Sequence, residues 1–333
     1  MNQASDVVRR RVLASLAGGA LSAVLPLRTL AQSTAYPRKP ITLVVPFPPG
    51  GTVDAMSRQV AEAVGVKLGQ PVVVENRPGA ATLLATQQVA RAPADGYTLL
   101  ITTTALAINA VAHPKPNYDP LSSFVPVAHM INTPALWIGR TALPGKDVRE
   151  VLNAYRAQPG KLSVGTWGPA SSVDIYAAMI QDTSKVQLTR VPYKGEAPAM
   201  MDVMSGTIDT AFVTVANYRA QVTSGRIRPL AVCGPQRHPL VPDVPTFAEV
   251  GIPGPSLAGY VGIVAPAGTP QAIVDRFATA VQEVMRTPQF AKRVESDWAF
   301  QLVAAGPADF GKTIARDLPR WERTVRDFHI RME

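Results

Sequence analysis

Short apolar runs alternate with segments of helical spacing along most of the chain. The first run, residues 41–47, is rich in β-branched residues, which favour a strand. The apolar positions after it lie three or four residues apart, as on one helix face, and are Val53, Met56, Val60 and Val64. Further strands are expected over residues 72–75, 97–102, 161–165, 188–191, 208–213 and 228–232. This alternation predicts the α/β fold class, with mainly parallel sheets flanked by helices.

Two regions break the alternation, residues 124–140 and the proline- and glycine-rich residues 241–266. If each crosses between lobes, the chain builds one α/β lobe, inserts a second and returns to the first. We therefore expect a lobe 1 made of residues 33–132 plus 256–333 and a lobe 2 made of residues 133–255. A two-lobed protein of this kind has a cleft between its lobes.

The returning leg contains two strong helix patterns. Thr269 and Pro270 predict an N-cap followed by a proline in the first helical position, an arrangement that suits a helix start. Apolar residues at helical spacing then follow, and a second stripe lies near the end of the chain. The two stripes are Ile273, Phe277, Val281 and Val284, and then Phe310, Ile314, Leu318, Trp321, Val325 and Phe328. We expect both stripes to face a core.

Composition supports sizeable cores and excludes global disorder. Hydrophobic residues make up 47% of the 333 residues and charged residues only 17%, which leaves ample apolar material to bury. The 31 prolines are nearly twice the usual share of about 5%. They are spread along the chain, and this distribution predicts rigid loops.

Residues 9–31 have the order of an export signal. Three arginines precede a mainly apolar run, and small residues follow up to Ala31, the expected cleavage site. The signal therefore spans residues 1–31 and predicts a periplasmic protein. Arg9 and Arg10 resemble a twin-arginine signal, but Val8 precedes them, so the export route stays open. The apolar run is interrupted by glycine, serine and proline, which argues against a membrane anchor.

Charge gives little support for nucleic-acid binding. The whole chain has a formal charge of +9, and loss of residues 1–31 leaves 29 basic and 23 acidic side chains, or +6. The arginines between Arg316 and Arg331 are interrupted by Asp317, Glu322 and Asp327, unlike a basic stripe. We therefore expect no nucleic-acid partner.

The first candidate ligand site is the turn between the first strand and the first helix. Its prolines lack N–H groups and leave carbonyl acceptors, while its glycines let a ligand approach the backbone. The helix then begins with free amides and a positive dipole end, which suit an anion. A plain turn in which Thr52 or Asp54 caps the helix is an equal alternative. The candidate residues are Phe47, Pro48, Pro49, Gly50, Gly51 and Thr52.

The second candidate site follows the strand at residues 161–165. A glycine-rich turn again leads to a helix N-terminus, although Ser171 or Ser172 is by itself better explained as an N-cap. Since ligands of open α/β sheets bind beyond the carboxyl ends of strands, two facing lobes would point both helix N-termini into one cleft. Such a cleft should prefer carboxylates. The residues of this turn are Thr166, Trp167, Ala170, Ser171 and Ser172.

Catalytic sites have little support in the sequence. His113, His129, His238 and His329 are scattered and lack metal-ligand spacing. No G-x-S-x-G elbow is present, so a serine hydrolase acting through Ser171 or Ser172 remains a minor alternative. The single cysteine, Cys233, excludes an intramolecular disulfide and is expected to be a buried small hydrophobe. We expect no enzyme, no metal and no cofactor.

Several motifs, in order along nearly all of the mature chain, resemble those of one family. They are Tyr36-Pro37 with Pro40-Ile41, VVPFPPGG at 44–51 with Asp54, VVVENRPG at 72–79, DGYTL at 95–99, VPYKG at 191–195 and PDVPT at 242–246. The chain resembles the Bug (TctC-like) solute receptors, the extracytoplasmic binding proteins of tripartite tricarboxylate transporters. The resemblance implies a two-lobed, type II-like periplasmic-binding-protein fold that closes on a small carboxylate and delivers it to membrane permease subunits. We expect it to be a monomer.

The same resemblance assigns the site residues. The turn from Thr166 to Ser172 would hold the ligand carboxylate through amides and hydroxyls, and the turn from Phe47 to Thr52 would add backbone groups. Thr103 and Thr104, together with Asp209 and Phe212, would line the cleft.

In the family pattern a histidine often follows the serines, whereas Val173 stands there in this chain, and Trp167 is unusual in the turn. We hypothesise that its ring forms a wall for an aromatic or long-chain carboxylate. Packing of Trp167 between the lobes is an equally good alternative. A ligand-sensing subunit that reports to a membrane kinase would have the same cleft and stays open as a second function.

Overall fold

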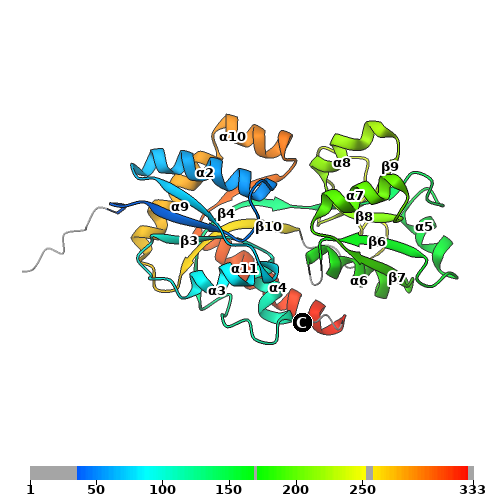
Figure 1. The fold of residues 1–333 in the computed structure, drawn as a ribbon, viewed down its shortest axis with the longest axis horizontal. Coiled ribbons are helices and arrows are strands. Elements are labelled where there is room, and N and C mark those ends of the chain that lie inside the picture. The colour runs from blue at the N-terminus through cyan, green and yellow to red at the C-terminus, as the bar shows by residue number, and fades with distance from the viewer. Residues whose placement is uncertain (1–35, 169–170, 253–257, 329–333) are drawn as a thin grey trace, which may run out of the picture. The chain divides into compact units, whose positions relative to one another are not determined.

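The computed structural model describes residues 36–168, 171–252 and 258–328, so the predicted signal at residues 1–31 lies outside the described residues. Within them the chain forms two β-sheets, each flanked by helices (Figure 1). The α/β class and the two-lobed architecture predicted from the alternating pattern are confirmed. We call the first sheet with its helices the first lobe, and the second sheet with its helices the second lobe.

The first sheet has the strand order β11-β4-β10-β3-β1-β2. Its strands are β1 (Ile41–Val45), β2 (Val72–Asn76), β3 (Thr98–Thr103), β4 (Phe124–Thr133), β10 (Gly259–Pro266) and β11 (Gln301–Ala305). Helices that contact this sheet or one another are α2 (Thr52–Leu68), α3 (Leu83–Ala90), α4 (Ala105–Ala112), α9 (Gln271–Met285) and α11 (Pro307–Asp327). Short α10 (Pro288–Lys292) and a π-helical turn, η3 (Arg293–Asp297), connect α9 to β11.

The second sheet has the strand order β7-β6-β8-β5-β9. Its strands are β5 (Ala135–Arg140), β6 (Leu162–Thr166), β7 (Leu188–Pro192), β8 (Thr210–Thr214) and β9 (Ile227–Cys233). The helices of this lobe are α5 (Val148–Tyr155), α6 (Ser172–Ser184), α7 (Glu196–Ser205) and α8 (Val215–Gln221). The 3₁₀ turn η2 (Val222–Ser224) follows α8. The other 3₁₀ turn, η1 (Ala80–Thr82), lies in the first lobe and precedes α3.

The sheets are mixed, which corrects the expectation of mainly parallel sheets. Strands β2, β1 and β3 are parallel, as are β7, β6 and β8. The other pairings are antiparallel. These antiparallel pairings involve strands next to the crossing segments, where no crossover helix imposes a parallel direction.

The region of residues 124–140, which breaks the alternation, consists of two strands and crosses from one sheet to the other. It forms β4 of the first sheet and β5 of the second, separated by Pro134. Proline has no N–H to donate to a ladder, so it ends one strand before the next begins. The second region that breaks the alternation, residues 241–266, ends in β10, where Gly259 pairs with Thr133 of β4. The two crossing strands therefore lie side by side.

The two returning helices differ slightly from their sequence patterns. Helix α9 begins at Gln271 with Pro270 in the N-cap position, and the Thr269 hydroxyl donates to the carbonyl of Pro266 at 2.7 Å. The prediction of Thr269 as N-cap is therefore wrong by one residue, because its hydroxyl closes the preceding turn. In α11 the predicted stripe is buried from Phe310 to Val325, which confirms that it faces a core.

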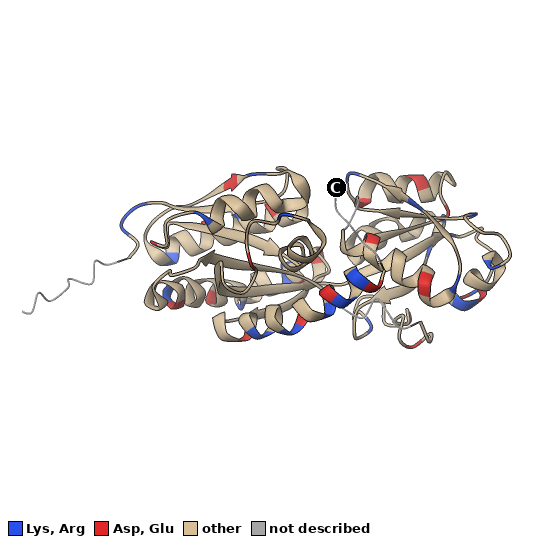
Figure 2. Cartoon of the chain, turned by 90° about the horizontal axis from the view of Figure 1, so that it is seen from below, with Lys and Arg blue, Asp and Glu red and all other residues tan. Residues whose placement is uncertain are grey.

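Among the described residues, buried apolar side chains form clusters within each lobe and a further cluster that joins the second lobe to α4 and α11. Cys233 is free and fully buried in that further cluster, as predicted for a small hydrophobe. Trp321 of α11 belongs to it and stacks on Tyr176 of α6 with ring centres 6.3 Å apart. Basic and acidic residues are intermixed along the cartoon (Figure 2). On α11, ion pairs with Asp309, Asp317 and Asp327 are formed by Lys312, Arg316, Arg320 and Arg326.

Candidate functional site

The turn between β1 and α2 lies at the carboxyl end of β1, where ligands of parallel sheets bind. Gly50 has a φ of 90°, a left-handed conformation that favours glycine. Gly51 is the N-cap of α2 and provides no side-chain cap. The alternative in which Thr52 or Asp54 caps the helix is therefore not what the structure shows. The first helical turn keeps its amides clear of any capping side chain.

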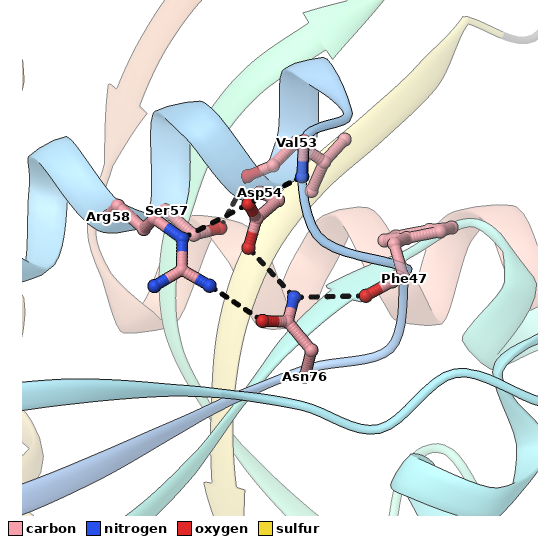
Figure 3. A network of polar contacts seen from close by, with 7 residues as sticks. Phe47, Val53, Asp54, Ser57, Arg58 and Asn76 are labelled. Atoms are coloured by element: carbon pink, nitrogen blue, oxygen red, sulfur yellow. Dashed lines mark hydrogen bonds and ion pairs between the residues drawn. The ribbon is translucent and has the colours of Figure 1, made fainter.

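A network around Asp54 holds this turn in place (Figure 3). The buried Asp54 carboxylate accepts from the amide of Gly50 at 2.9 Å and from Nε of Arg58 at 3.0 Å. Its other oxygen accepts from the side-chain amide of Asn76 at 2.7 Å. Asn76 also donates to the carbonyl of Phe47 at 3.0 Å and accepts from Arg58 at 2.6 Å. Both ends of the turn are thus tied to the end of β2.

The charge state of Asp54 follows from these contacts. Burial acts to raise its pKa, but the hydrogen bonds from Arg58, Asn76 and Gly50 outweigh it and lower the pKa below the ordinary value of 3.8. Asp54 is therefore an ionised carboxylate that its own surroundings neutralise. Its hydrogen bonds stabilise the turn, and the amides at the N-terminus of α2 stay available to another anion.

Thr103 and Thr104 lie at the same edge of the first sheet. Thr103 ends β3, which is parallel to β1, so both strands end on the same side. The Thr103 hydroxyl accepts from the amide of Ala105 at 3.2 Å, and Thr104 is buried. The structure brings these residues to the edge that carries the turn from Phe47 to Thr52.

The second turn begins at the carboxyl end of β6. Thr166 is buried, and its carbonyl accepts from the amide of Tyr193 at 3.0 Å. Ser171 is the N-cap of α6: its hydroxyl accepts from the amide of Asp174 at 3.3 Å and donates to the carbonyl of Gly168 at 2.8 Å. Ser172 is the first residue of the helix and is partly exposed. The N-cap interpretation thus holds for Ser171, and Ala170 lies outside the described residues.

Trp167 is fixed in this turn by its own indole. Its Nε1 donates to the carbonyl of Phe212 at 2.8 Å, and its ring is partly buried against the core cluster. Because the N–H is already engaged, the ring offers apolar surface rather than a donor. The fixed position of the ring is compatible with a wall for the ligand. Its contacts with the core cluster are equally compatible with a packing role.

The structure corrects the expectations for Phe212 and Asp209. The Phe212 side chain is fully buried between Trp137 and Tyr176, so only its carbonyl reaches Trp167. Asp209 precedes β8 and lies at the opposite, amino end of that strand.

The contacts of Asp209 explain its placement. Its carboxylate accepts from the amide and hydroxyl of Ser163 at 3.0 and 2.8 Å and pairs with Arg140 at 2.9 Å. It therefore ties the starts of β6 and β8 to the end of β5 and does not line the edge that carries Trp167.

The sequence analysis gave no role to Asn76 and Glu196, two residues near the candidate turns. The Glu196 carboxylate accepts from the amide of Thr214 and, at 3.2 Å, from its hydroxyl. Burial raises the pKa of Glu196 although Thr214 and Asn217 donate to it. The start of α8 is therefore already occupied by an internal carboxylate. Both residues lie inside quoted motifs or next to them, but their roles depend on strand neighbours far away in sequence.

A surface groove of about 570 Å³ lies elsewhere on the first lobe, between α2 and the edge strand β2. Its apolar lining includes Val66, Val72 and Val74, and it contains none of the predicted site residues. Within the described residues, no group of histidines, cysteines and carboxylates is suitable to hold a metal ion. In the same part of the chain no helix has the length and hydrophobicity needed to span a membrane.

The geometry can be compared with known proteins. The chain is 33% identical over 98% of its length to the "UPF0065 protein in tcbD-tcbE intergenic region" of Pseudomonas sp. (strain P51), and covers 96% of that protein. It is 30% identical to "Protein BugT" of Bordetella pertussis over 88% of this chain and 90% of the relative.

Two solved structures are also similar. The R. palustris protein Rpa4515 with adipate has a TM-score of 0.79 and 30% identity, and the match covers 89% of this chain and 99% of that one. MatC from Rhodopseudomonas palustris with bound malate has a TM-score of 0.75 and 30% identity, over 87% and 100% of the two chains. The model of the TctC family, described as "Tripartite tricarboxylate transporter family receptor", matches residues 56–330. The protein therefore belongs to the TctC family of tripartite tricarboxylate transporter receptors, to which the Bug-type periplasmic binding proteins are similar.

Proposed function

We propose that this protein is an exported receptor that binds a small organic carboxylate between its lobes and delivers it to the permease of a tripartite transporter. The observation that carries the proposal is that two relatives of the same fold were solved with the dicarboxylates adipate and malate. The protein acts as a binding protein and catalyses no reaction in this proposal. Residues 1–31 would direct its export and be removed after Ala31.

The first lobe supports an anion at the start of α2. Gly51 caps the helix with backbone alone, so amides and the positive end of the helix dipole are available to a carboxylate. The exposed residues from Pro48 to Thr52 let a ligand approach. The Asp54 network fixes the loop beforehand, which reduces the entropy lost on binding.

The second lobe supports the same chemistry at the start of α6. Ser172 opens the helix, and its partly exposed side chain belongs to the turn that begins at Thr166. The starts of α7 and α8 differ, because Glu196 lies on the first turn of α7 and its carboxylate accepts from the N-cap Thr214 of α8. Among these three helix starts, α6 is the one we assign to the ligand.

The test removes single backbone amides without altering the helix start. Proline is tolerated in the first helical position but has no N–H, and Gly51 and Ser171 already have the extended conformations that precede proline. Thr52→Pro and Ser172→Pro should each weaken carboxylate binding about tenfold, the loss of one charge-assisted hydrogen bond. Thr52→Ala and Ser172→Ala keep the amides and are the matched controls.

Binding is measured by isothermal titration after native mass spectrometry has identified the carboxylate that the purified protein carries. Equal affinities of the proline and alanine variants at both positions would contradict the proposed sites. Recovery of a ligand without a carboxylate would contradict the proposed function itself.

The finer ligand class rests on Trp167. With its N–H engaged by Phe212, the indole offers a flat apolar surface that suits an aromatic or long-chain carboxylate. Benzoate should then compete with the natural ligand better than acetate does, and Trp167→Leu should remove that difference. Equal competition in the unchanged protein would reject the aromatic wall and leave packing as the role of Trp167.

A further inference from the structure

The loop after β9 reaches the turn before β11, and this contact joins the two lobes. His238 of the loop is 2% exposed, and its Nε2 lies 3.1 Å from the carbonyl oxygen of Ala299. Strand β9 belongs to the second sheet and β11 to the first. The imidazole thus links the lobes through residues 61 positions apart in sequence.

Each partner is fixed to its own lobe. The loop that carries His238 is held to β9, because the amide of Val232 donates to Pro245 at 2.8 Å and that of Phe247 donates to Val232 at 3.3 Å. On the other side, the amide of Phe300 donates to Val294 at 2.9 Å. A movement of the lobes that separates these two segments must therefore stretch the contact between His238 and Ala299.

Ala299 enters the second lobe in an unfavourable backbone conformation. It is 1% exposed and lies in the apolar cluster that contains Val213, Val232 and Val241 of that lobe. Its φ is 50°, in the left-handed region that costs an alanine roughly 1 kcal/mol. Contacts with the second lobe help to hold a conformation that alanine otherwise avoids.

The hydrogen bonds of His238 define its protonation state. Its Nδ1 accepts from the amide of Leu240 at 3.2 Å, so the proton of the neutral ring is on Nε2 and is donated to Ala299. A second proton on Nδ1 would abolish the bond from Leu240, because a protonated ring nitrogen cannot accept. The Nε2–H group would still donate to Ala299, so the protonated ring is disfavoured by its positive charge in a buried site, which water can hydrate only when the lobes separate.

We propose that His238 is a proton-sensitive clasp: the neutral imidazole holds the two lobes in the arrangement of the structure, and protonation releases them. The geometry gives this role to the contact independently of which ligand is bound. A periplasmic protein is exposed to external pH, so acidification would loosen the lobes and favour ligand release.

The direction of the pH effect follows from the surroundings of His238. Burial lowers its pKa below the ordinary value of 6.5, the bond to Ala299 acts to raise it, and the charge of Arg219 on α8 lowers it further. The clasp is therefore fully present above pH 6.5 and is lost as the pH falls through the lowered value. The other charged residues on the packed segments are Arg237 paired with Glu249, Arg293 with Asp297, and exposed Asp243, Lys292 and Glu295.

The test measures the distance between the lobes in ligand-free protein. Spin labels on Val66→Cys and Met201→Cys, at exposed positions of α2 and α7, report this distance by double electron–electron resonance in a Cys233→Ala background. One main distance is expected at pH 7.5 and a second, longer one at pH 5. His238→Ala should raise the longer population about fivefold at pH 7.5, as expected for one lost hydrogen bond.

His238→Gln is the decisive variant, because its side-chain amide can donate to Ala299 but does not titrate. Its distances should be the same at pH 5 and pH 7.5. His129→Gln is the matched control: His129 is also buried, but it lies in the first lobe and contacts Asn132 at 3.0 Å, so this variant should keep the pH response.

Thermal unfolding at both pH values shows that each variant is folded when its distances are measured. A pH response retained in His238→Gln, or no pH response in the unchanged protein, would overturn the clasp. Since no ligand is added, such a result would leave the proposed carboxylate binding standing, and failure of carboxylate binding would leave the clasp standing.

Discussion

The two candidate ligand turns have the same task but are held by different forces. Both connect the carboxyl end of a strand to the start of a helix. The turn of the first lobe depends on one buried carboxylate, Asp54, which receives hydrogen bonds from three residues. In the second lobe Trp167 and Ser171 make separate neutral hydrogen bonds. A single substitution should therefore damage the first turn more than the second.

The largest effect is expected for Asp54→Ala. The change removes one acceptor from the exposed amide of Gly50 and from the side chain of Asn76, which keeps its bond to Phe47, next to a buried position. This should cost about 2 kcal/mol of the free energy of unfolding. Arg58 is half exposed, so its charge can return to water. Urea unfolding of the variant and the unchanged protein measures the difference, and a loss below about 1 kcal/mol would show that the network is not cooperative.

The pH dependence of the unfolding free energy, measured for Asp54→Ala and for the unchanged protein, gives a control. Because the pKa of Asp54 is lowered, its contribution is present above pH 3.8 and is lost as the pH falls through the lowered value. The stability difference between the two proteins should therefore be constant near neutrality and shrink in strong acid. A difference that is constant down to pH 2 would assign the loss to packing instead of charge.

The turn of the first lobe could be predicted from local sequence. The Asp54 and Asn76 contacts that stabilise it could not. Two prolines and two glycines at 48–51 restrict and free the backbone within four residues, so the turn follows from local chemistry. Asn76 reaches Phe47 across 29 residues, and this contact requires the parallel pairing of β1 with β2. No local pattern contains that pairing.

A smaller loss is expected for Trp167→Phe. The phenyl ring keeps much of the packing but cannot donate to the carbonyl of Phe212, which should cost about 1.5 kcal/mol. Phe212 remains held in the core by Trp137 and Tyr176, so the effect should stay local. Hydrogen exchange should then accelerate in β6 and β8 while β1 is unaffected. Equal acceleration in both lobes would contradict independent turns.

The placement of Asp209 shows what a family resemblance alone does not provide. The apolar pattern predicts a strand over 208–213 and β8 spans Thr210–Thr214, so Asp209 lies at the amino end of the strand in both cases. Its partners there are Arg140 and Ser163. The resemblance placed it in the cleft, whereas the direction of the strand and its register with neighbouring strands decide which edge of the sheet it joins. The same register brings Trp167 to Phe212, 45 residues away.

The smallest effect is expected at Ser171. Ser171→Ala removes the acceptor for the amide of Asp174, and loss of such a cap costs about 1 kcal/mol, whereas Ser171→Gly should cost only about 0.3 kcal/mol because glycine suits the N-cap position. The hydroxyl is absent from both variants, so they separate helix capping from ligand contact. If the hydroxyl binds the carboxylate, both should lose affinity equally although their unfolding free energies differ. If Ser171 only caps α6, affinity should follow stability, and titration calorimetry beside urea unfolding distinguishes the two roles.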